Sequence, residues 1–183
     1  MSERMGVQLD QRPSLGHIVL RGDATSSGFL EAASRTLGCA LPLRANRFVD
    51  AENARVCWLG PSEWLIMVAA PVGARTAEQL RAALTGEFAA VTELGSGQAV
   101  LGISGSHARE VLAKGCALDL HPRVFGPGQC AQTLLARAGV TILQTSAAPA
   151  FELVVRRSYA DYVWRWLTDA KLSLTYKWHP VVQ

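Results

Sequence analysis

The sequence predicts a mixed α+β fold, built from two related β-α-β-β-α halves whose sheets are mostly antiparallel. Three observations support this prediction. Runs rich in β-branched and aromatic residues alternate with amphipathic stretches of helical period. Short turns that contain Gly or Pro join neighbouring β-rich runs, as in hairpins. One short segment also occurs twice with little change, and mixed β-α-β-β-α-β units are a recurring motif in proteins.

In the first half, the predicted elements have clear start and stop signals. Ser26 or Ser27 can cap the first helix, which stops at Gly38. A Gly-Pro-Ser turn separates two β-rich runs and predicts a hairpin. Thr76 and Gln79 form a capping box for the second helix. Strands are expected at 17–21, 56–59, 64–68 and 90–94, helices at 27–37 and 76–88, and a loop at 42–53.

The second half is expected to repeat this order of elements. Ser106 and Ser158 are the expected N-caps of its two helices, because Ser at this position accepts hydrogen bonds from free backbone N–H groups. Strands are expected at 99–104, 129–136, 140–144 and 151–156, and helices at 107–114 and 158–172.

The repeated segment indicates where the two halves begin and end. Residues 37–41 and 114–118 both contain Gly-Cys-Ala-Leu, and each segment closes a helix that follows a strand and a turn glycine. Four matching residues can arise by chance, but the matching order of elements favours duplication. The predicted division is a flexible N-terminus at 1–14, one half at 15–94, a second half at 95–172 and a tail at 173–183.

The composition narrows the functional classes. Hydrophobic residues make up 49% and charged residues 18% of the 183 residues, against about 25% charged residues in an average globular protein. A low-charge surface is typical of a protein covered by a partner, although a well-filled core gives the same composition. A net charge of +3 with scattered Lys and Arg does not favour nucleic-acid binding.

The apolar runs and the cysteine spacing indicate the cellular compartment of the protein. No apolar run is long enough to span a bilayer, and the first residues contain no apolar signal core. The four cysteines lie far apart without a C-x-x-C pair, which argues against a zinc or redox motif and favours reduced, mostly buried thiols. The sequence therefore predicts a cytoplasmic protein that does not contact membranes.

Two motifs resemble functional loops but stand in the wrong context. Residues 126–131 fit G-x-G-x-x-A, yet they follow a loop and open a strand, and Pro127 lacks an N–H donor for a pyrophosphate. Residues 102–106 resemble a nucleophile elbow around Ser104, but the final Gly is replaced by Ser106. Plain turns are favoured at both places.

The remaining polar residues do not form a catalytic or metal-binding pattern. Asp119 and His121 follow Ser104 in the order of a hydrolase triad, but they lie together in one short segment. The four histidines have no ligand spacing, and the carboxylates show no acid–base pair. We therefore expect no catalytic, cofactor-binding or metal-binding residues on this chain.

The last predicted helix carries the most informative surface. Its apolar residues recur at 3, 4 spacing and predict a core stripe. Trp164 lies about 100° from Val163 by helical geometry, so it is either a rim residue or an interface anchor. The stripe comprises Tyr159, Tyr162, Val163, Trp166, Leu167 and Ala170.

Flanking residues extend this candidate interface. Arg156 and Arg157 precede the helix and either pair with acidic groups of a partner or form a solvated corner. The segment 177–182 is apolar for a chain end and contains Trp178, so we expect it to dock. The candidate partner-interface residues are Arg156, Arg157, Trp164 and Trp178.

Several segments together resemble the gamma subunits of heterotetrameric sarcosine oxidases. The likeness covers about residues 55–170, is most specific between Glu93 and Leu167, and includes the hairpin Leu-Gly-Pro-Ser-Glu-Trp-Leu-Ile at 59–66. The other matching segments are 93–101, 103–105, 111–116, 118–122, 125–126, 130–133, 151–153, 155–158, 160 and 164–167. Such subunits belong to the superfamily of folate-binding aminomethyltransferase domains, which implies the same fold and explains duplicated halves.

The resemblance implies a role inside an oxidoreductase complex. The family complex demethylates sarcosine with O₂ and yields glycine, hydrogen peroxide and a one-carbon unit, as formaldehyde or methylenetetrahydrofolate. FAD, FMN, NAD, tetrahydrofolate and zinc are implied on the alpha, beta and delta subunits. The gamma subunit is implied to carry no prosthetic group and to serve assembly.

Two alternatives remain open. A free-standing folate-binding or aminomethyltransferase-like protein is disfavoured because the chain lacks the Asn-Gly-Gly-x-x-Asp segment of folate enzymes. Lys114-Gly115-Cys116 is similar to a K-G-C-x-x-G-Q motif of another folate-binding branch, but it continues as Ala-Leu-Asp. A serine hydrolase built on Ser104 is disfavoured by the altered elbow.

Overall fold

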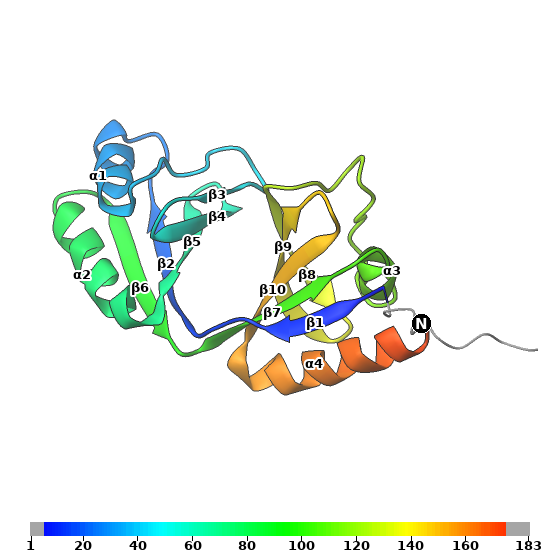
Figure 1. Cartoon of the computed structure of the whole chain (residues 1–183). Helices are drawn as coiled ribbons and strands as arrows, with labels where there is room; N and C mark the ends of the chain where they lie inside the picture. Colours follow the sequence, from blue (N-terminus) through cyan, green and yellow to red (C-terminus); the bar gives the residue numbers. More distant parts are fainter. Residues whose placement is uncertain (1–5, 175–183) are drawn as a thin grey trace, which may run out of the picture.

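The computed structural model describes residues 6–174 and confirms a mixed α+β fold with antiparallel sheets (Figure 1). In chain order the elements are β1 Gln8–Gln11, β2 Leu15–Gly22, α1 Ser27–Leu37, β3 Phe48–Asp50, β4 Ala54–Gly60, β5 Glu63–Ala69, η1 Ala70–Val72, α2 Gly73–Ala83, β6 Ala89–Gly95, β7 Gln98–Ser104, α3 Ala108–Ala113, β8 Gln129–Leu135, β9 Ala138–Ser146, β10 Ala150–Arg156 and α4 Arg157–Leu172.

The two sheets have matching strand orders. The first sheet runs β3-β4-β5-β2-β6 and the second runs β8-β9-β10-β7-β1. Each half therefore contains β-α-β-β-β-α, one strand more than the predicted β-α-β-β-α unit, and a fifth strand, β6 in the first sheet and β1 in the second, completes each sheet. The strand missed in the first half is β3, which has only three residues and lies in the segment expected to be a loop. Duplication stays a prediction, and the matching strand order supports it.

The N-terminal segment differs from the expected flexible one. Residues 8–11 form β1, which pairs antiparallel with β7 from Gln8 opposite Ser104 to Gln11 opposite Leu101. Val7 is buried in the core of the second sheet. Strand β1 is short and polar, so its sequence does not predict a strand. It forms a strand because its backbone pairs with the free edge of β7.

Four layers result, because each sheet is covered on both faces. Helices α1 and α2 cover the outer face of the first sheet, and α3 and α4 cover the second (Figure 1). The inner faces of the two sheets pack against each other along a seam. The core of this seam consists of Phe48, Cys57, Leu65, Met67, Val100, Cys130, Leu143 and Val154.

The caps of α1 are those predicted. The Ser26 side chain accepts a hydrogen bond from the Phe29 N–H, and Gly38 ends the helix in the left-handed conformation at φ 73°. The other predicted caps are wrong. Thr76 lies inside α2 and its hydroxyl donates to the Val72 carbonyl, at 2.8 Å, because the short helix η1 already leads the chain into α2.

The second half also lacks its predicted serine caps. Helix α3 begins at Ala108 and α4 at Arg157, and neither has a side-chain cap hydrogen bond. Arg157 continues directly from β10, and its N–H donates to the Gly97 carbonyl at 2.9 Å. A backbone contact from the turn between β6 and β7 therefore replaces the expected Ser158 cap.

The two repeated glycines are required for different reasons. Gly38 has the left-handed conformation in open space, whereas a Cβ on Gly115 would lie 2.4 Å from the Trp166 ring and 3.2 Å from the Ala136 nitrogen. Gly115 thus allows α4 to pack closely over the end of α3.

We predict that Gly115→Ala destabilises the fold by about 1–3 kcal/mol, because the added methyl group overpacks the contact with Trp166. Gly139→Ala is the matched control, since nothing lies within 4 Å of its Cβ position. Urea unfolding of the two variants and the parent chain measures the difference. Equal stability of both variants would show that α4 shifts freely.

A buried histidine lies on the inner face of β2. His17 is fully buried, and neither ring nitrogen has a hydrogen-bond partner among residues 6–174. Burial lowers the pKa of His17. The folded chain therefore keeps this imidazole neutral under conditions where the unfolded chain binds a proton.

The free energy of unfolding is predicted to fall as the pH drops below about 6.5, the ordinary pKa of histidine. The unfolded chain takes up a proton there and the folded chain does not, so His17 contributes a slope of at most about 1.4 kcal/mol per pH unit. His17→Leu should flatten this dependence between pH 7.5 and 5.5, as measured by urea unfolding of the variant and the parent chain at several pH values. If His17→Leu leaves the pH dependence of the unfolding free energy unchanged, His17 is not its source.

Candidate functional site

Two grooves open onto the seam at opposite ends of the same strands. On β2 one groove reaches Leu15 and the other reaches Val19, and on β10 they reach Glu152 and Arg156 respectively. We call the first the ion-paired groove and the second the cleft. Both grooves collect side chains from the two sheets, so neither could be assembled from one half alone.

The ion-paired groove is crossed by a chain of charged side chains. Arg55 on β4 binds Asp50 on β3 and also Glu152 on β10, and Glu152 in turn accepts from Arg12 at 3.3 Å. Arg12 also pairs with Asp10 on β1, at 3.0 Å. Each arginine of this groove therefore has carboxylate partners, and the network joins the two sheets. Half-buried charge pairs of this kind need such partners to offset their desolvation.

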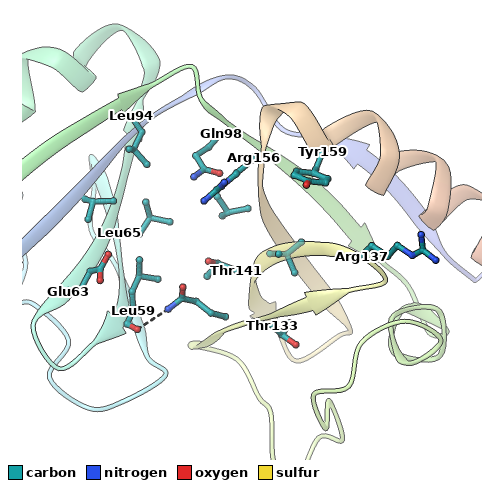
Figure 2. Close-up of a pocket in the computed structure, with 15 residues that line it drawn as sticks. Leu59, Glu63, Leu65, Leu94, Gln98, Thr133, Arg137, Thr141, Arg156 and Tyr159 are labelled. Atoms are coloured by element: carbon teal, nitrogen blue, oxygen red, sulfur yellow. Dashed lines mark hydrogen bonds between the residues drawn. The ribbon is translucent and has the colours of Figure 1, made fainter.

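The cleft has a volume of about 480 Å³ and a mixed polar lining (Figure 2). The first sheet contributes mainly leucines, and β7 to β10 contribute hydroxyl, amide and guanidinium groups. The Gln132 amide crosses from β8 to the first sheet and donates to the Leu59 carbonyl at 2.9 Å. The lining residues are Val19, Leu59, Glu63, Leu65, Leu94, Gln98, Gln132, Thr133, Arg137, Gly139, Val140, Thr141, Val154, Arg156 and Tyr159.

The charges of the cleft are not balanced. Glu63 is its one carboxylate, and it already pairs with Arg21 at 3.1 Å. Arg156 and Arg137 form no ion pair with any residue between 6 and 174. Figure 2 shows Arg156 beside Gln98, with its side chain directed toward the first sheet, and Arg137 at the outer edge. The cleft is thus electropositive.

The candidate interface residues lie in different surroundings. Arg156 lines the cleft, whereas the Arg157 guanidinium donates to the Ser96 carbonyl and holds the turn between the two halves. Trp164 is 36% exposed and lies about 140° around α4 from Tyr159 by helical geometry. Trp178 lies outside the described residues. The structure therefore does not bring the four candidates together into one patch within the described range.

The predicted core stripe of α4 is wrong at two positions. Val163 and Leu167 are buried, but Tyr159 and Tyr162 are exposed by 44% and 38%. Tyr159 lines the cleft, a role that the sequence pattern did not indicate. The buried stripe narrows toward the start of α4 because the cleft opens there. Helical spacing alone could not predict this exposure of the two tyrosines.

The hydrolase alternative finds no support in the geometry. The Asp119 carboxylate accepts from the His121 N–H at 2.8 Å, and the His121 ring accepts from the Arg123 N–H at 3.2 Å. Both groups are thereby engaged in their own loop. Ser104 lies in the sheet opposite Ala150, and no hydrogen bond joins it to His121 among the described residues.

The glycine loop at 126–131 is a turn into β8, as predicted. The Gly126 N–H donates to the Gln129 side chain at 2.7 Å and the Gly128 N–H donates to the Gln144 carbonyl at 3.0 Å. These donors are used internally and do not face a phosphate. Within residues 6–174, no three His, Cys, Asp or Glu side chains group as a metal site requires. None of the helices in that range is long and apolar enough to cross a bilayer.

Solved structures with the same fold include a sarcosine oxidase and an aminomethyltransferase. A chain of the heterotetrameric sarcosine oxidase from Corynebacterium sp. U-96, in complex with pyrrole 2-carboxylate, matches with a TM-score of 0.85 and 29% identity over 94% of this chain and 87% of that chain. The glycine cleavage system aminomethyltransferase T from Bartonella henselae matches with a TM-score of 0.69 and 17% identity, over 92% of this chain and 47% of that chain. The second likeness shows the fold alone.

Sequence comparisons agree with the structural one. The sarcosine oxidase subunit gamma of Corynebacterium sp. (strain P-1) is 35% identical over 165 residues, which cover 90% of this chain and 79% of that protein. The subunit gamma of Arthrobacter sp is 34% identical over 180 residues, covering 92% and 87%. The family model described as sarcosine oxidase, gamma subunit family, matches residues 21–173. The chain belongs to the sarcosine oxidase gamma subunit family.

Proposed function

We propose that this chain is the gamma subunit of a heterotetrameric sarcosine oxidase and that its role there is assembly. The observation that carries the proposal is the likeness over nearly the whole chain to subunits of that name, at 34–35% identity. The complex would convert sarcosine and O₂ into glycine, hydrogen peroxide and a one-carbon unit. The partners would be the alpha, beta and delta subunits in the cytoplasm, and these would hold FAD, FMN, NAD, tetrahydrofolate and zinc.

The arrangement of the polar groups supports assembly over catalysis by this chain. Acid–base and nucleophilic catalysis need a nucleophile within hydrogen-bond reach of a base. The cleft offers arginine, amide, hydroxyl and phenol groups, and its one carboxylate is held by Arg21. Such groups recognise and orient a partner. The free-standing folate-binding alternative rests on the fold shared with aminomethyltransferase T.

The exposed aromatic residues of α4 support a partner surface there. Trp164, Tyr162 and Tyr159 are each more than a third exposed. Trp, Tyr and Arg are the residue types that dominate interface energetics when a partner buries them. Arg157 is the weakest of the four candidates, because its guanidinium already binds the Ser96 carbonyl. We keep Arg156, Trp164 and Trp178 as the main proposed contacts.

The isolated chain is predicted to be colourless and unable to produce peroxide from sarcosine. The physical reason is that flavin chemistry belongs to the proposed partners. Purify the chain alone and, separately, co-express it with the alpha, beta and delta subunits, then record absorption spectra and peroxide release. A flavin spectrum from the single chain, or failure of the four chains to co-purify, would contradict the proposed function.

Trp164→Ala is predicted to weaken assembly by about tenfold or more, because truncation of an interface anchor commonly costs over 1 kcal/mol and at hot spots 2 kcal/mol or more. Trp164 is 36% exposed and therefore partly packed on α4, so thermal unfolding of the isolated variant must first confirm that it folds. The matched control is Phe88→Ala, an aromatic residue 93% exposed on the other half. Titration of labelled gamma chain against the remaining subunits gives both affinities. If Phe88→Ala weakens assembly and Trp164→Ala does not, the partner binds the first half.

A further inference from the structure

We propose that the cleft binds an acidic side chain, Asp or Glu, of a partner subunit, with Arg156 as the main anchor. This inference rests on the proposed function, because it needs a complex in which a partner is present. It goes beyond that function by naming the site on this chain and the chemistry of the group that occupies it.

The two grooves of the seam differ in their charge balance. In the ion-paired groove, Arg12 and Arg55 both pair with the Glu152 carboxylate, and each has a further aspartate. In the cleft, Arg137 and Arg156 have no carboxylate within the described residues, and Glu63 is committed to Arg21. A carboxylate from outside would give the cleft the charge balance that the other groove already has.

The local geometry at Arg156 suits a carboxylate. Arg156 is the last residue of β10 and lies directly before α4. Gln98 lies directly opposite Arg156 in the β7–β10 pair, and Tyr159 follows one turn into the helix. A guanidinium group binds a carboxylate with two parallel hydrogen bonds. The Gln98 amide and the Tyr159 hydroxyl supply further donors in the same cleft.

The exposure of the cleft residues favours a protein partner over a free small molecule. Small-molecule sites are mostly apolar and bury most of the ligand surface. Here the anchoring residues Arg156 and Tyr159 are exposed, and the exposed Tyr162 continues the same flank of α4. An interface with a central arginine and flanking tyrosines matches the composition of protein–protein hot spots. The carboxylate is therefore assigned to a side chain of a partner subunit.

Charge removal gives the first test. In the complex of four subunits, Arg156→Gln should weaken binding of this chain by at least about tenfold, since loss of one member of an interfacial charge pair acts mainly on dissociation. Arg165→Gln is the matched control, because Arg165 lies on the adjoining helix α4 and its side chain is 77% exposed and paired with Asp161. Thermal unfolding of both isolated variants confirms that they fold. Equal affinity of Arg156→Gln and the parent chain overturns the proposal.

Carbodiimide coupling gives the second test and identifies the partner group. Arg156→Lys places a primary amine in the cleft, and a carbodiimide joins such an amine to a carboxylate in direct contact. Mass spectrometry of the treated complex should find a peptide containing position 156 linked to an Asp or Glu of another subunit. The same treatment of Arg165→Lys should give no such link between subunits. A cross-link at 165 with none at 156 overturns the proposal.

A third arm separates the two possible sources of a carboxylate. Glutarate serves as the free dicarboxylate probe, and its binding to the isolated chain is measured by calorimetry. Three results together would show that the cleft is a small-molecule site and that the proposal is wrong. The parent chain would bind glutarate at micromolar concentration, Arg156→Gln would abolish this binding, and assembly of the Arg156→Gln variant would be unchanged. If the wild-type chain itself fails to assemble with the three subunits, the proposed function fails, and this outcome is distinct from a loss confined to Arg156→Gln.

Discussion

The packing of the two sheets against each other along the seam is the constraint on which the rest of the molecule depends. Its core buries side chains from both halves, including Cys57, Leu65, Leu143 and Val154. The backbone also crosses the seam, where the Phe48 N–H donates to the Gly128 carbonyl and joins β3 to the second sheet. Because each sheet is buried on both faces, each needs helices on its outer face, and the four-layer order follows.

The chain crosses between the sheets twice, and both crossings are held by hydrogen bonds. After β1 it returns to the first sheet, with the Arg12 N–H donating to the Val100 carbonyl, and between β6 and β7 it passes through Gly97, which accepts from the Arg157 N–H. The two halves are thus interlocked. Because Arg157 binds the carbonyls of Gly97 and Ser96, the start of α4 is fixed to the turn between the halves.

Sequence reasoning predicted the elements with strong local signals and missed those that depend on distant neighbours. Helix α1 was predicted with both caps because Ser26 and Gly38 act within one turn of their partners. Strands β1 and β3 are short and become strands only beside β7 and β4. The cleft could not be predicted because its lining comes from both sheets. Arg156 and Trp164 lie only eight positions apart in the sequence, yet the turn of α4 places Trp164 on a different flank from the cleft.

The strand register explains why the charges are paired in one groove of the seam and unbalanced in the other. When the two sheets are matched strand for strand from their turn glycines, Arg55 of β4 corresponds to Thr141 of β9, and Glu152 of β10 corresponds to Leu65 of β5. The long charged pair that spans one groove is thus replaced in the other by a short hydroxyl and an apolar side chain. Neither can form a salt bridge across the seam or neutralise Arg156, so the register that pairs the charges in one groove leaves uncompensated positive charge in the other.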